Sequence, residues 1–287
     1  MKYVSQPFQF GTRTLDLATP QVMGILNVTP DSFSDGGELL AGGRPDLDGV
    51  TRRAEAMVAA GATLLDIGGE STRPGAAAVT LQEELDRVLP VLDALRRLDV
   101  VLSVDTSSPE LMRLAPAHGA GLINDVRALE RPGALAAAAA SGLPVCLMHR
   151  QGEPATMQNA PVYRDVVAEV CIWLQARVQA SEAAGISRER LLVDPGFGFG
   201  KTLDHNLQLL DGLEALQVLE LPVLIGLSRK RMLGALTGKP EKERAVAGVA
   251  AAVIGVMKGA CIVRTHDVEA TVDAMKVCRA LLELPRE

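Results

Sequence analysis

The sequence predicts an α/β protein built as one (β/α)8 TIM barrel, because short apolar segments alternate with helix-like segments and each apolar segment runs into polar residues or glycine. The apolar segments are continuous rather than alternating, which is typical of parallel strands covered by helices. Eight of them occur, at residues 21–27, 63–69, 100–106, 122–126, 144–149, 191–196, 222–228 and 261–266. Eight strand and helix alternations indicate a closed barrel.

The segments between these strands have the spacing of helices. Apolar residues recur three and four positions apart at residues 47–62, 81–98 and 165–185. Gly61 and Gly185 stand at the ends of the first and third of these segments, and glycine suits the left-handed residue that closes a helix. The alanine run at 134–140 is also good helix sequence.

The chain is expected to form a single domain with a short N-terminal cap. Residues 1–20 precede the first strand and are expected to cover the bottom of the barrel, which residues 21–287 form. No stretch has the composition of a linker. With 287 residues, of which 48% are hydrophobic and 22% charged, the chain is long enough and apolar enough to bury a sizeable core.

Charge and hydropathy exclude some classes of partner. The net charge of −6 argues against a general nucleic-acid or anionic-membrane surface, so an anionic ligand must be met by a local cluster of cations. The first residues, MKYVSQPFQFG, contain no apolar run like that of a signal peptide, and no later segment reaches the roughly 18 uninterrupted apolar residues of a membrane span. A cytoplasmic protein is expected.

The cysteines show no pattern of metal or disulfide chemistry. None of the four belongs to a CxxC pair, and they are Cys146, Cys171, Cys261 and Cys278. Two lie inside predicted strands, so we interpret them as small buried apolar side chains.

Polar residues stand at the carboxyl ends of the predicted strands, where a core would not select them. In barrels of this class these ends and their loops build the active site. An unpaired buried polar group costs about 1–3 kcal/mol. The residues are Asn27, Asp66, Asp105, Asn124, Asp125, His149, Asp194, Ser228, Arg229, Lys230, Arg264, Thr265 and His266. So many at one rim predict a ligand site.

These rim residues divide into two chemical sets. Hydrogen-bond acceptors suited to a flat heterocycle with an amide edge and an exocyclic amine are Asp66, Asp105, Asn124 and Asp194. Cations or donors that could hold phosphate oxygens or cover a ring face are Arg73, Lys230, Arg264 and His266. Together they predict a heterocycle that carries an anionic group.

Eight segments closely resemble, in order and spacing, the signature segments of dihydropteroate synthase. They are MGILNVTPDSFSDGG, DIGGESTRPGA, SVDTS, LINDVRAL, LPVCLMH, DPGFGFGKT, GLSRKRM and IVRTHDV, and the resemblance runs from about residue 20 to about residue 275. It implies a barrel enzyme that transfers an alkyl group other than methyl. Such an enzyme condenses 6-hydroxymethyl-7,8-dihydropterin diphosphate with p-aminobenzoate, with Mg2+, to give diphosphate and 7,8-dihydropteroate for folate synthesis. Sulfonamides compete for the p-aminobenzoate site, and the family is usually homodimeric.

The resemblance also assigns expected roles to residues of this chain. Those expected on the pterin are Asp66, Asp105, Asn124, Met148, Asp194, Lys230 and Arg264. Those expected on the diphosphate are Asn27, Thr72, Arg73, Arg264 and His266, and Asn27 is also expected to bind Mg2+. The p-aminobenzoate pocket is expected from Phe33, Thr72, Pro74 and Ser228. The expected catalytic residues are Lys230, Arg264, His266 and Asn27.

Two loops, residues 28–37 and 69–77, are expected to close over the site. Loss of diphosphate would leave a pterin-stabilised cation that water could capture, so a lid is needed until the aniline nitrogen attacks. The resemblance implies this dissociative, SN1-like course. An aniline is largely neutral at pH 7, so no strong general base is required, and the pterin is expected to bind before p-aminobenzoate.

Three other interpretations were weighed. DPGFGFGKT suggests a phosphate-binding P-loop, but that motif needs glycine where this chain has Pro195. A pterin-dependent methyltransferase acting on a corrinoid protein would share part of the pocket, but it would not need the SFSDGG and STRPG loops. A non-catalytic pterin-binding barrel would be favoured by a missing rim cation or lid, and none is missing.

Overall fold

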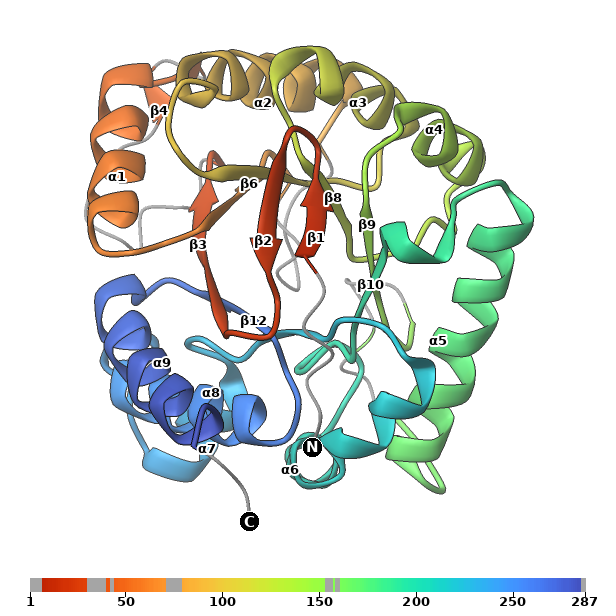
Figure 1. Cartoon of the computed structure of the whole chain (residues 1–287), viewed down its shortest axis with the longest axis vertical. Coiled ribbons are helices and arrows are strands. Elements are labelled where there is room, and N and C mark those ends of the chain that lie inside the picture. Colours follow the sequence, from red (N-terminus) through yellow and green to blue (C-terminus); the bar gives the residue numbers. More distant parts are fainter. Residues whose placement is uncertain are drawn as a thin grey trace.

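The computed structural model describes residues 7–29, 40–41, 44–70, 79–152, 157 and 161–284, and its centre is a barrel of eight parallel strands (Figure 1). In chain order the barrel strands are β3 (Gln21–Asn27), β6 (Leu64–Gly68), β7 (Val101–Asp105), β8 (Leu122–Asp125), β9 (Val145–Met148), β10 (Leu191–Asp194), β11 (Leu224–Gly226) and β12 (Ile262–Thr265). Each lies inside one of the eight predicted segments, and the predicted fold class is confirmed.

The barrel closes because strands that follow one another along the chain are also neighbours in space. The hydrogen-bonded order is β10, β9, β8, β7, β6, β3, β12, β11. A parallel bridge between Val193 and Val223 joins the two outer strands of this order, and the amide of Val193 donates to the carbonyl oxygen of Pro222 at 3.0 Å. All eight carboxyl ends therefore meet at one rim.

Helices surround the barrel on its outside (Figure 1). They are α1 (Leu47–Ala59), α2 (Leu81–Leu95), α3 (Pro109–Leu114), α4 (Ala134–Ser141), α5 (Val166–Ala183), α6 (Leu203–Asp211), α7 (Arg231–Thr237), α8 (Ala245–Met257) and α9 (Val268–Leu282). Short 3-10 helices cover Ala115–His118, Arg188–Arg190, Leu213–Leu219 and Glu241–Glu243. The segments predicted from apolar spacing form α1, α2 and α5.

Local signals in the sequence explain where two of these helices begin. The hydroxyl of Thr80 accepts from the amide of Glu83, whose carboxylate accepts from the amide of Thr80 in return, and this capping box starts α2. The carboxylate of Asp165 accepts from the amides of Val167 and Ala168 and starts α5.

A hairpin lies across the amino-terminal end of the barrel, opposite the rim. It pairs β1 (Pro7–Phe10) with β2 (Arg13–Asp16) in antiparallel register. Phe8 and Phe10 pack into an apolar cluster with residues from the starts of the barrel strands, among them Met23, Leu64 and Leu122. Figure 1 shows this hairpin across the centre of the barrel. A second, two-residue pair, β4 (Leu40–Ala41) and β5 (Arg44–Pro45), precedes α1.

The main core fills the space between the strands and the helices that cover them. Every described residue of β6, β8, β9 and β10 is buried. The four cysteines are free thiols, with Cys146, Cys261 and Cys278 buried and Cys171 half-buried. Within the described ranges, no helix combines the length and hydrophobicity needed to cross a bilayer.

Candidate active site

A pocket with an empty volume of about 360 Å³ lies at the carboxyl ends of the barrel strands. Six of the seven residues predicted to hold the pterin line it, and they are Asp105, Asn124, Met148, Asp194, Lys230 and Arg264. They come from β7, β8, β9, β10, β12 and the residue that precedes α7. The fold thus brings together residues that are up to 159 positions apart in the sequence.

Arg264 joins two carboxylates on neighbouring strands. Its Nε donates to Asp66 Oδ2 at 2.5 Å, and its Nη2 donates to Asp105 Oδ2 at 3.0 Å. Burial alone would lower the pKa of Arg264, but the charges of Asp66 and Asp105 raise it above its ordinary value. Burial, together with the charge of Asp66, raises the pKa of Asp105. The guanidinium therefore stays charged in the physiological range. Its positive charge offsets the repulsion between the neighbouring acidic groups Asp66 and Asp105.

Asp66, the seventh predicted pterin residue, lies behind the pocket wall. Its side chain is 0% exposed. Besides Arg264 it accepts from the hydroxyl of Ser103 at 2.6 Å and from Nδ2 of Asn124 at 3.0 Å. Three donors thus bind this buried carboxylate. Their hydrogen bonds offset the free-energy cost of burying its charge.

The contact with Asp66 sets the orientation of the Asn124 amide. Nδ2 donates to Asp66, so the amide oxygen is directed away from that carboxylate, and Asn124 lines the pocket. Asn124 is 4% exposed, and its Oδ1 has no hydrogen-bond partner within the described part of the chain. A buried acceptor without a partner indicates that a ligand donates to it.

Asp194 and Lys230 form the opposite wall. Oδ1 of Asp194 accepts from the amide of Gly196 at 2.7 Å. Burial raises the pKa of Asp194 to about 6, against the effect of this hydrogen bond and of the nearby lysines, so the group is mainly a carboxylate at neutral pH. Nζ of Lys230 lies 4.2 Å from the ring centre of Phe199, and burial lowers its pKa to about 8 although Asp194 opposes the shift.

Ser228 and His266 lie side by side at the ends of β11 and β12. The hydroxyl oxygen of Ser228 is 3.1 Å from Nδ1 of His266 and accepts from the His266 amide at 3.2 Å. Asp267 fixes this corner because its carboxylate binds both the Ser228 hydroxyl, at 3.5 Å, and Nη2 of Arg229, at 2.8 Å. A hydroxyl and an imidazole are thereby presented together at the rim.

Asn27, the last residue of β3, is half-buried at the same rim. A Cβ atom added to Gly68 would lie 3.3 Å from Oδ1 of Asn27 and 3.7 Å from Oδ2 of Asp105. Glycine at this position therefore leaves open a space that two oxygen atoms border. Phe33, Thr72, Arg73 and Pro74 lie outside the described residues, as does most of both predicted loops, and their roles stay predictions.

Sequence reasoning did not single out five of the residues that line the pocket. They are Val126, Gly196, Phe197, Phe199 and Gly226. The two phenylalanines belong to DPGFGFGKT, one of the eight segments that carry the resemblance, which assigns them no role. Their alternation with glycines directly after a strand end was a usable signal, because large apolar side chains in a rim turn must pack onto the site or be exposed.

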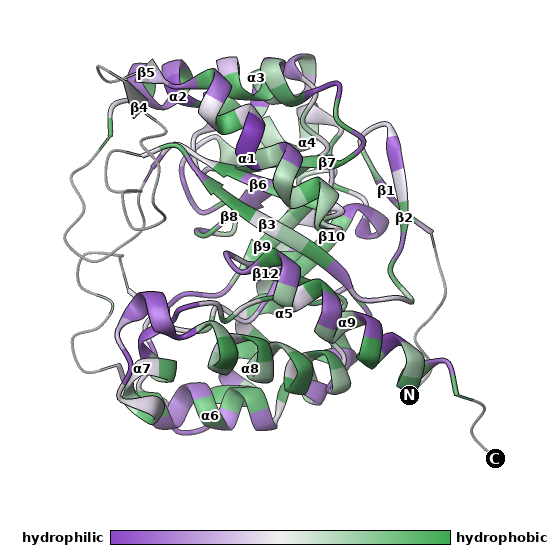
Figure 2. Cartoon of the chain, turned by 90° about the vertical axis from the view of Figure 1, so that its left-hand side faces the viewer, coloured by the Kyte–Doolittle hydropathy of each residue, from purple (hydrophilic) through white to green (hydrophobic). Residues whose placement is uncertain are grey.

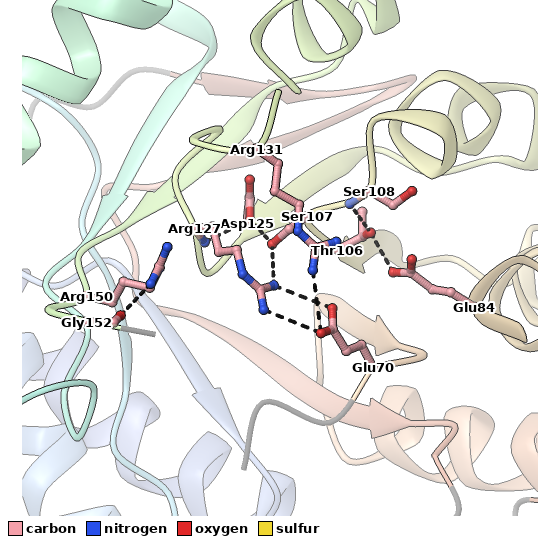
Figure 3. A network of polar contacts seen from close by, with 10 residues as sticks. All are labelled: Glu70, Glu84, Thr106, Ser107, Ser108, Asp125, Arg127, Arg131, Arg150 and Gly152. Carbon is pink, nitrogen blue, oxygen red and sulfur yellow. Dashed lines mark hydrogen bonds and ion pairs between the residues drawn. The ribbon is translucent and has the colours of Figure 1, made fainter. Parts of the chain in front are cut away.

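A second polar network lies on the rim beside the pocket (Figure 3). The carboxylate of Glu70 lies 3.4 Å from Nη2 of Arg127 and 3.7 Å from Nη2 of Arg131. Asp125 accepts from the hydroxyl of Ser107 and from the amides of Arg127 and Leu129, the last two at 2.8 Å. These contacts hold the turn after β8 and fix Glu70, the last described residue before 71–78.

Comparison with known proteins agrees with this geometry. Residues 23–266 match the family model of pterin binding enzymes. The dihydropteroate synthase of Escherichia coli (strain K12) is 54% identical over 276 residues, which is 96% of each chain. The structure of Yersinia pestis dihydropteroate synthase in complex with a sulfonamide drug has a TM-score of 0.92 at 53% identity, over 97% of this chain and 100% of that one.

A third relative carries a reaction product. The structure of Burkholderia cenocepacia dihydropteroate synthase complexed with 7,8-dihydropteroate has a TM-score of 0.86 at 49% identity, over 98% of both chains. Identity near one half over almost the full length, with the same fold, shows that this chain belongs to the dihydropteroate synthase family.

Proposed function

We propose that the chain condenses 6-hydroxymethyl-7,8-dihydropterin diphosphate with p-aminobenzoate to form 7,8-dihydropteroate and diphosphate, a transferase step of folate biosynthesis. The observation that best supports this is the pocket itself, where the unpartnered Oδ1 of Asn124 and the carboxylate of Asp194 are buried acceptors close to the cations Lys230 and Arg264. A 2-amino-4-oxo pterin ring carries the matching donors and acceptors. The 7,8-dihydropteroate bound to the Burkholderia relative supports the same ligand class.

The pterin ring is held through its edges. Asp194 accepts from N3 and from the 2-amino group in two parallel hydrogen bonds, which a carboxylate makes strongly because it is charged. Asn124 accepts a further N–H through Oδ1, and Lys230 donates to an acceptor on another edge. Arg264 lies along the ring and reaches the diphosphate. Asp105 and Met148, which line the pocket, form the rest of the pterin site.

Bond cleavage follows the dissociative course. The bond between the pterin methylene carbon and the diphosphate oxygen breaks, both electrons leave with the oxygen, and the pterin ring spreads the resulting positive charge. The nitrogen of p-aminobenzoate then attacks the methylene carbon and releases a proton to solvent. Arg264, His266 and Asn27 stabilise the departing negative charge. Such electrostatic stabilisation by preorganised groups is usually the largest contribution to catalysis. Thr72 and Arg73 are proposed to assist on the diphosphate.

The residues at the rim fit Mg2+ brought in with the substrate. Mg2+ commonly binds one or two protein oxygens together with substrate phosphates and water. Asn27 offers such an oxygen, and in the ranges that the structure describes no cluster of three or more His, Cys, Asp or Glu forms a separate metal site. Asn27 would hold the ion together with the diphosphate. When bound, Mg2+ would neutralise charge on the leaving group.

The p-aminobenzoate site is proposed beside His266, where Ser228 presents its hydroxyl. Phe33, Thr72 and Pro74 are proposed to complete it. Since the Yersinia relative binds a sulfonamide drug, sulfonamides are proposed to compete with p-aminobenzoate here as well.

The activity is tested by mass spectrometry of the product. Purified protein with 6-hydroxymethyl-7,8-dihydropterin diphosphate, p-aminobenzoate and Mg2+ should yield 7,8-dihydropteroate and diphosphate, and omission of either substrate should abolish the product. Replacement of Mg2+ by a chelator should lower the rate. Failure to form 7,8-dihydropteroate with all components present would contradict the proposal.

We also propose that the chain acts as a homodimer in the cytoplasm. Large apolar side chains are exposed on neighbouring helices, with Val246 and Ile254 on α8 and Val277 and Leu281 on α9, and α8 is hydrophobic along most of its length (Figure 2). Such a surface is stabilised when a partner covers it. Sedimentation velocity should give a dimer, and Ile254→Glu should give monomers.

The proposed location in the cytoplasm is supported by the four free thiols, which agree with a reducing compartment.

A further inference from the structure

A buried lysine that has no part in the proposed reaction lies behind the pocket wall. Lys201 follows the glycine-rich turn after β10 and is only 3% exposed. Its ammonium donates to Nδ1 of His149 at 2.9 Å and to the carbonyl oxygens of Gly196 and Phe199 at 2.9 and 3.2 Å. Three donors of one charged group thus meet three neutral acceptors. Such an arrangement is costly to build into a core, which indicates that the ammonium has a specific task.

His149 is kept neutral, so that it can accept this hydrogen bond. It follows the last residue of β9, is 4% exposed and meets Trp173 in a T-shaped contact with ring centres 4.9 Å apart. Burial, and then the charge of Lys201, lower the pKa of His149 to about 2. Because Nδ1 accepts, the proton of the neutral ring is on Nε2.

The ammonium lies inside the curl of the glycine-rich turn. Gly196 and Gly198 have φ values of +67° and +78°, a region that favours glycine, and a Cβ on Gly196 would lie 1.8 Å from the carbonyl oxygen of His149. The amide of Phe199 donates to the oxygen of Gly196 at 3.1 Å, and Lys201 binds the same oxygen. The turn is therefore closed around one charged group.

The curled turn also shapes the substrate site. Gly196 and Phe199 line the pocket, and the ring of Phe199 lies 4.2 Å below Nζ of Lys230. A Cβ on Gly198 would lie 3.1 Å from Cδ of Lys230, so the turn packs directly against that side chain. A change in the turn must move the aromatic ring, the lysine or both.

We propose that Lys201 and His149 form a positioning pair that holds the glycine-rich turn in the shape that the substrate site requires. The pair rests on the proposed function and deepens it, since neither residue lines the pocket and both act through Gly196, Phe199 and Lys230. Without the ammonium, the buried oxygens that it binds lose a donor, and the turn opens to find another.

The charges that face Lys201 support this role. Burial lowers the pKa of Lys201 to about 7, Asp194 raises it and Lys230 lowers it further. In return the charge of Lys201 lowers the pKa of Asp194 and so favours the carboxylate that the pterin needs. His149 is the neutral partner, and it adds no charge that would oppose either lysine at neutral pH.

The first test compares substitutions on both sides of the hydrogen bond. Lys201→Met keeps the length of the side chain but has no donor, and we expect the KM for the pterin diphosphate to rise roughly tenfold to a hundredfold with a smaller change in kcat. His149→Leu should act in the same direction. The double variant should be no worse than Lys201→Met, because the hydrogen bond that His149→Leu removes is already lost when Lys201 is replaced. His149→Asn can place an amide oxygen near the position of Nδ1 and should restore KM to within about threefold of wild type.

A matched control separates this effect from the loss of any lysine. Lys239 is exposed at the end of α7, so Lys239→Met should leave both kinetic constants unchanged. Additive losses in the double variant, or a fall in kcat with unchanged KM, would contradict the pair. If the wild-type protein forms no 7,8-dihydropteroate, the proposed function itself fails. If the wild type is active and Lys201→Met keeps its KM, only the pair fails.

A measurement on the wild-type protein tests the hydrogen bond directly and needs a variant only to assign one signal. The chain has four histidines, so nitrogen-15 labelling gives few signals, and His149→Asn identifies the one of interest. We expect His149 as the neutral tautomer with the proton on Nε2 at about pH 5 to about pH 6, where Lys201 is charged. A charged ring, or a proton on Nδ1, would overturn the proposed hydrogen bond.

Discussion

The two sides of the pocket hold their charges in opposite ways. On the ion-paired side, made of Asp66, Asp105 and Arg264, each charge meets an opposite charge at hydrogen-bond distance. On the glycine-loop side, made of Asp194, Lys201 and Lys230, the charged atoms contact a backbone amide, two backbone carbonyls, an imidazole and an aromatic ring. The first side is built on strands, and the second mainly on a turn.

This difference decides on which side the cations respond to pH. Carboxylates raise the pKa of Arg264 above its ordinary value, so its charge is permanent in the physiological range. Burial lowers the pKa of Lys230 to about 8 and that of Lys201 to about 7, so both can lose a proton near neutral pH. The cation of the ion-paired side is therefore fixed, although burial and the charge of Asp66 raise the pKa of Asp105 beside it to about 8. The cations of the glycine-loop side titrate near neutral pH.

The largest effect is expected when the ion-paired side loses its cation. Arg264→Met leaves Asp66 and Asp105 buried without an ionic partner, and removal of one member of a buried ion pair costs about 3–5 kcal/mol. Activity should also be lost, because Arg264 is proposed on both the pterin and the diphosphate. Chemical denaturation gives the free energy of unfolding, and the product assay gives the rate.

The pH dependence of that loss identifies its cause. A buried carboxyl whose folded pKa is raised binds its proton more tightly in the folded state, so the variant should regain stability as pH falls. We expect the difference from wild type to be smaller at about pH 5 than at about pH 7.5. An equal difference at both pH values would mean that lost packing, not unpaired charge, destabilises the variant.

On the glycine-loop side, loss of a cation should affect activity without a similar loss of stability. Burial lowers the pKa of Lys230 from 10.5 to about 8, so folding disfavours its charged form. The resulting loss of stability is complete below about pH 8 and becomes smaller as the pH rises toward 10.5. Lys230→Met should keep or raise the unfolding temperature at pH 7 while kcat/KM falls roughly tenfold to a hundredfold. A large fall in unfolding temperature would contradict the contrast between the two sides.

The same contrast marks the limit of what the sequence could predict. The fold and the residues Asp105, Asn124 and Asp194 were predictable, because a polar residue that ends an apolar strand has few places to go other than the rim. No feature of the sequence indicated that Asp66, inside such a strand, would lie behind the wall with Ser103 as a partner. Lys201 and His149 are 52 residues apart, and the pairing of β9 with β10, together with the curl of the turn between β10 and α6, brings them together.

Ligand affinity should fall at acid pH because Asp194 becomes protonated, and we call this fall the acid limb of binding. Its pKa is raised to about 6, so a carboxylate that accepts two N–H groups is present above that pH and lost below it. Affinity for 6-hydroxymethyl-7,8-dihydropterin, which has no phosphate groups that titrate near neutral pH, should fall as pH drops below about 6, measured by calorimetry. Asp194→Asn should bind weakly at every pH and lose this limb. A limb that persists in the variant would assign it to another group.

The smallest effect is expected from a hydrogen bond that supports the ion-paired side from behind. The hydroxyl of Ser103 donates to Oδ1 of Asp66 at 2.6 Å, and Ser103 is fully buried. Ser103→Ala removes this bond but leaves Arg264 and Asn124 on the other carboxylate oxygen, so the loss of stability should be about 1 kcal/mol and the loss of pterin affinity about twofold to fivefold. Because the fixed charges remain, the pH dependence of binding should match that of wild type. A shifted acid limb in Ser103→Ala would mean that the two sides of the pocket are electrostatically coupled through Asp66 and are not independent.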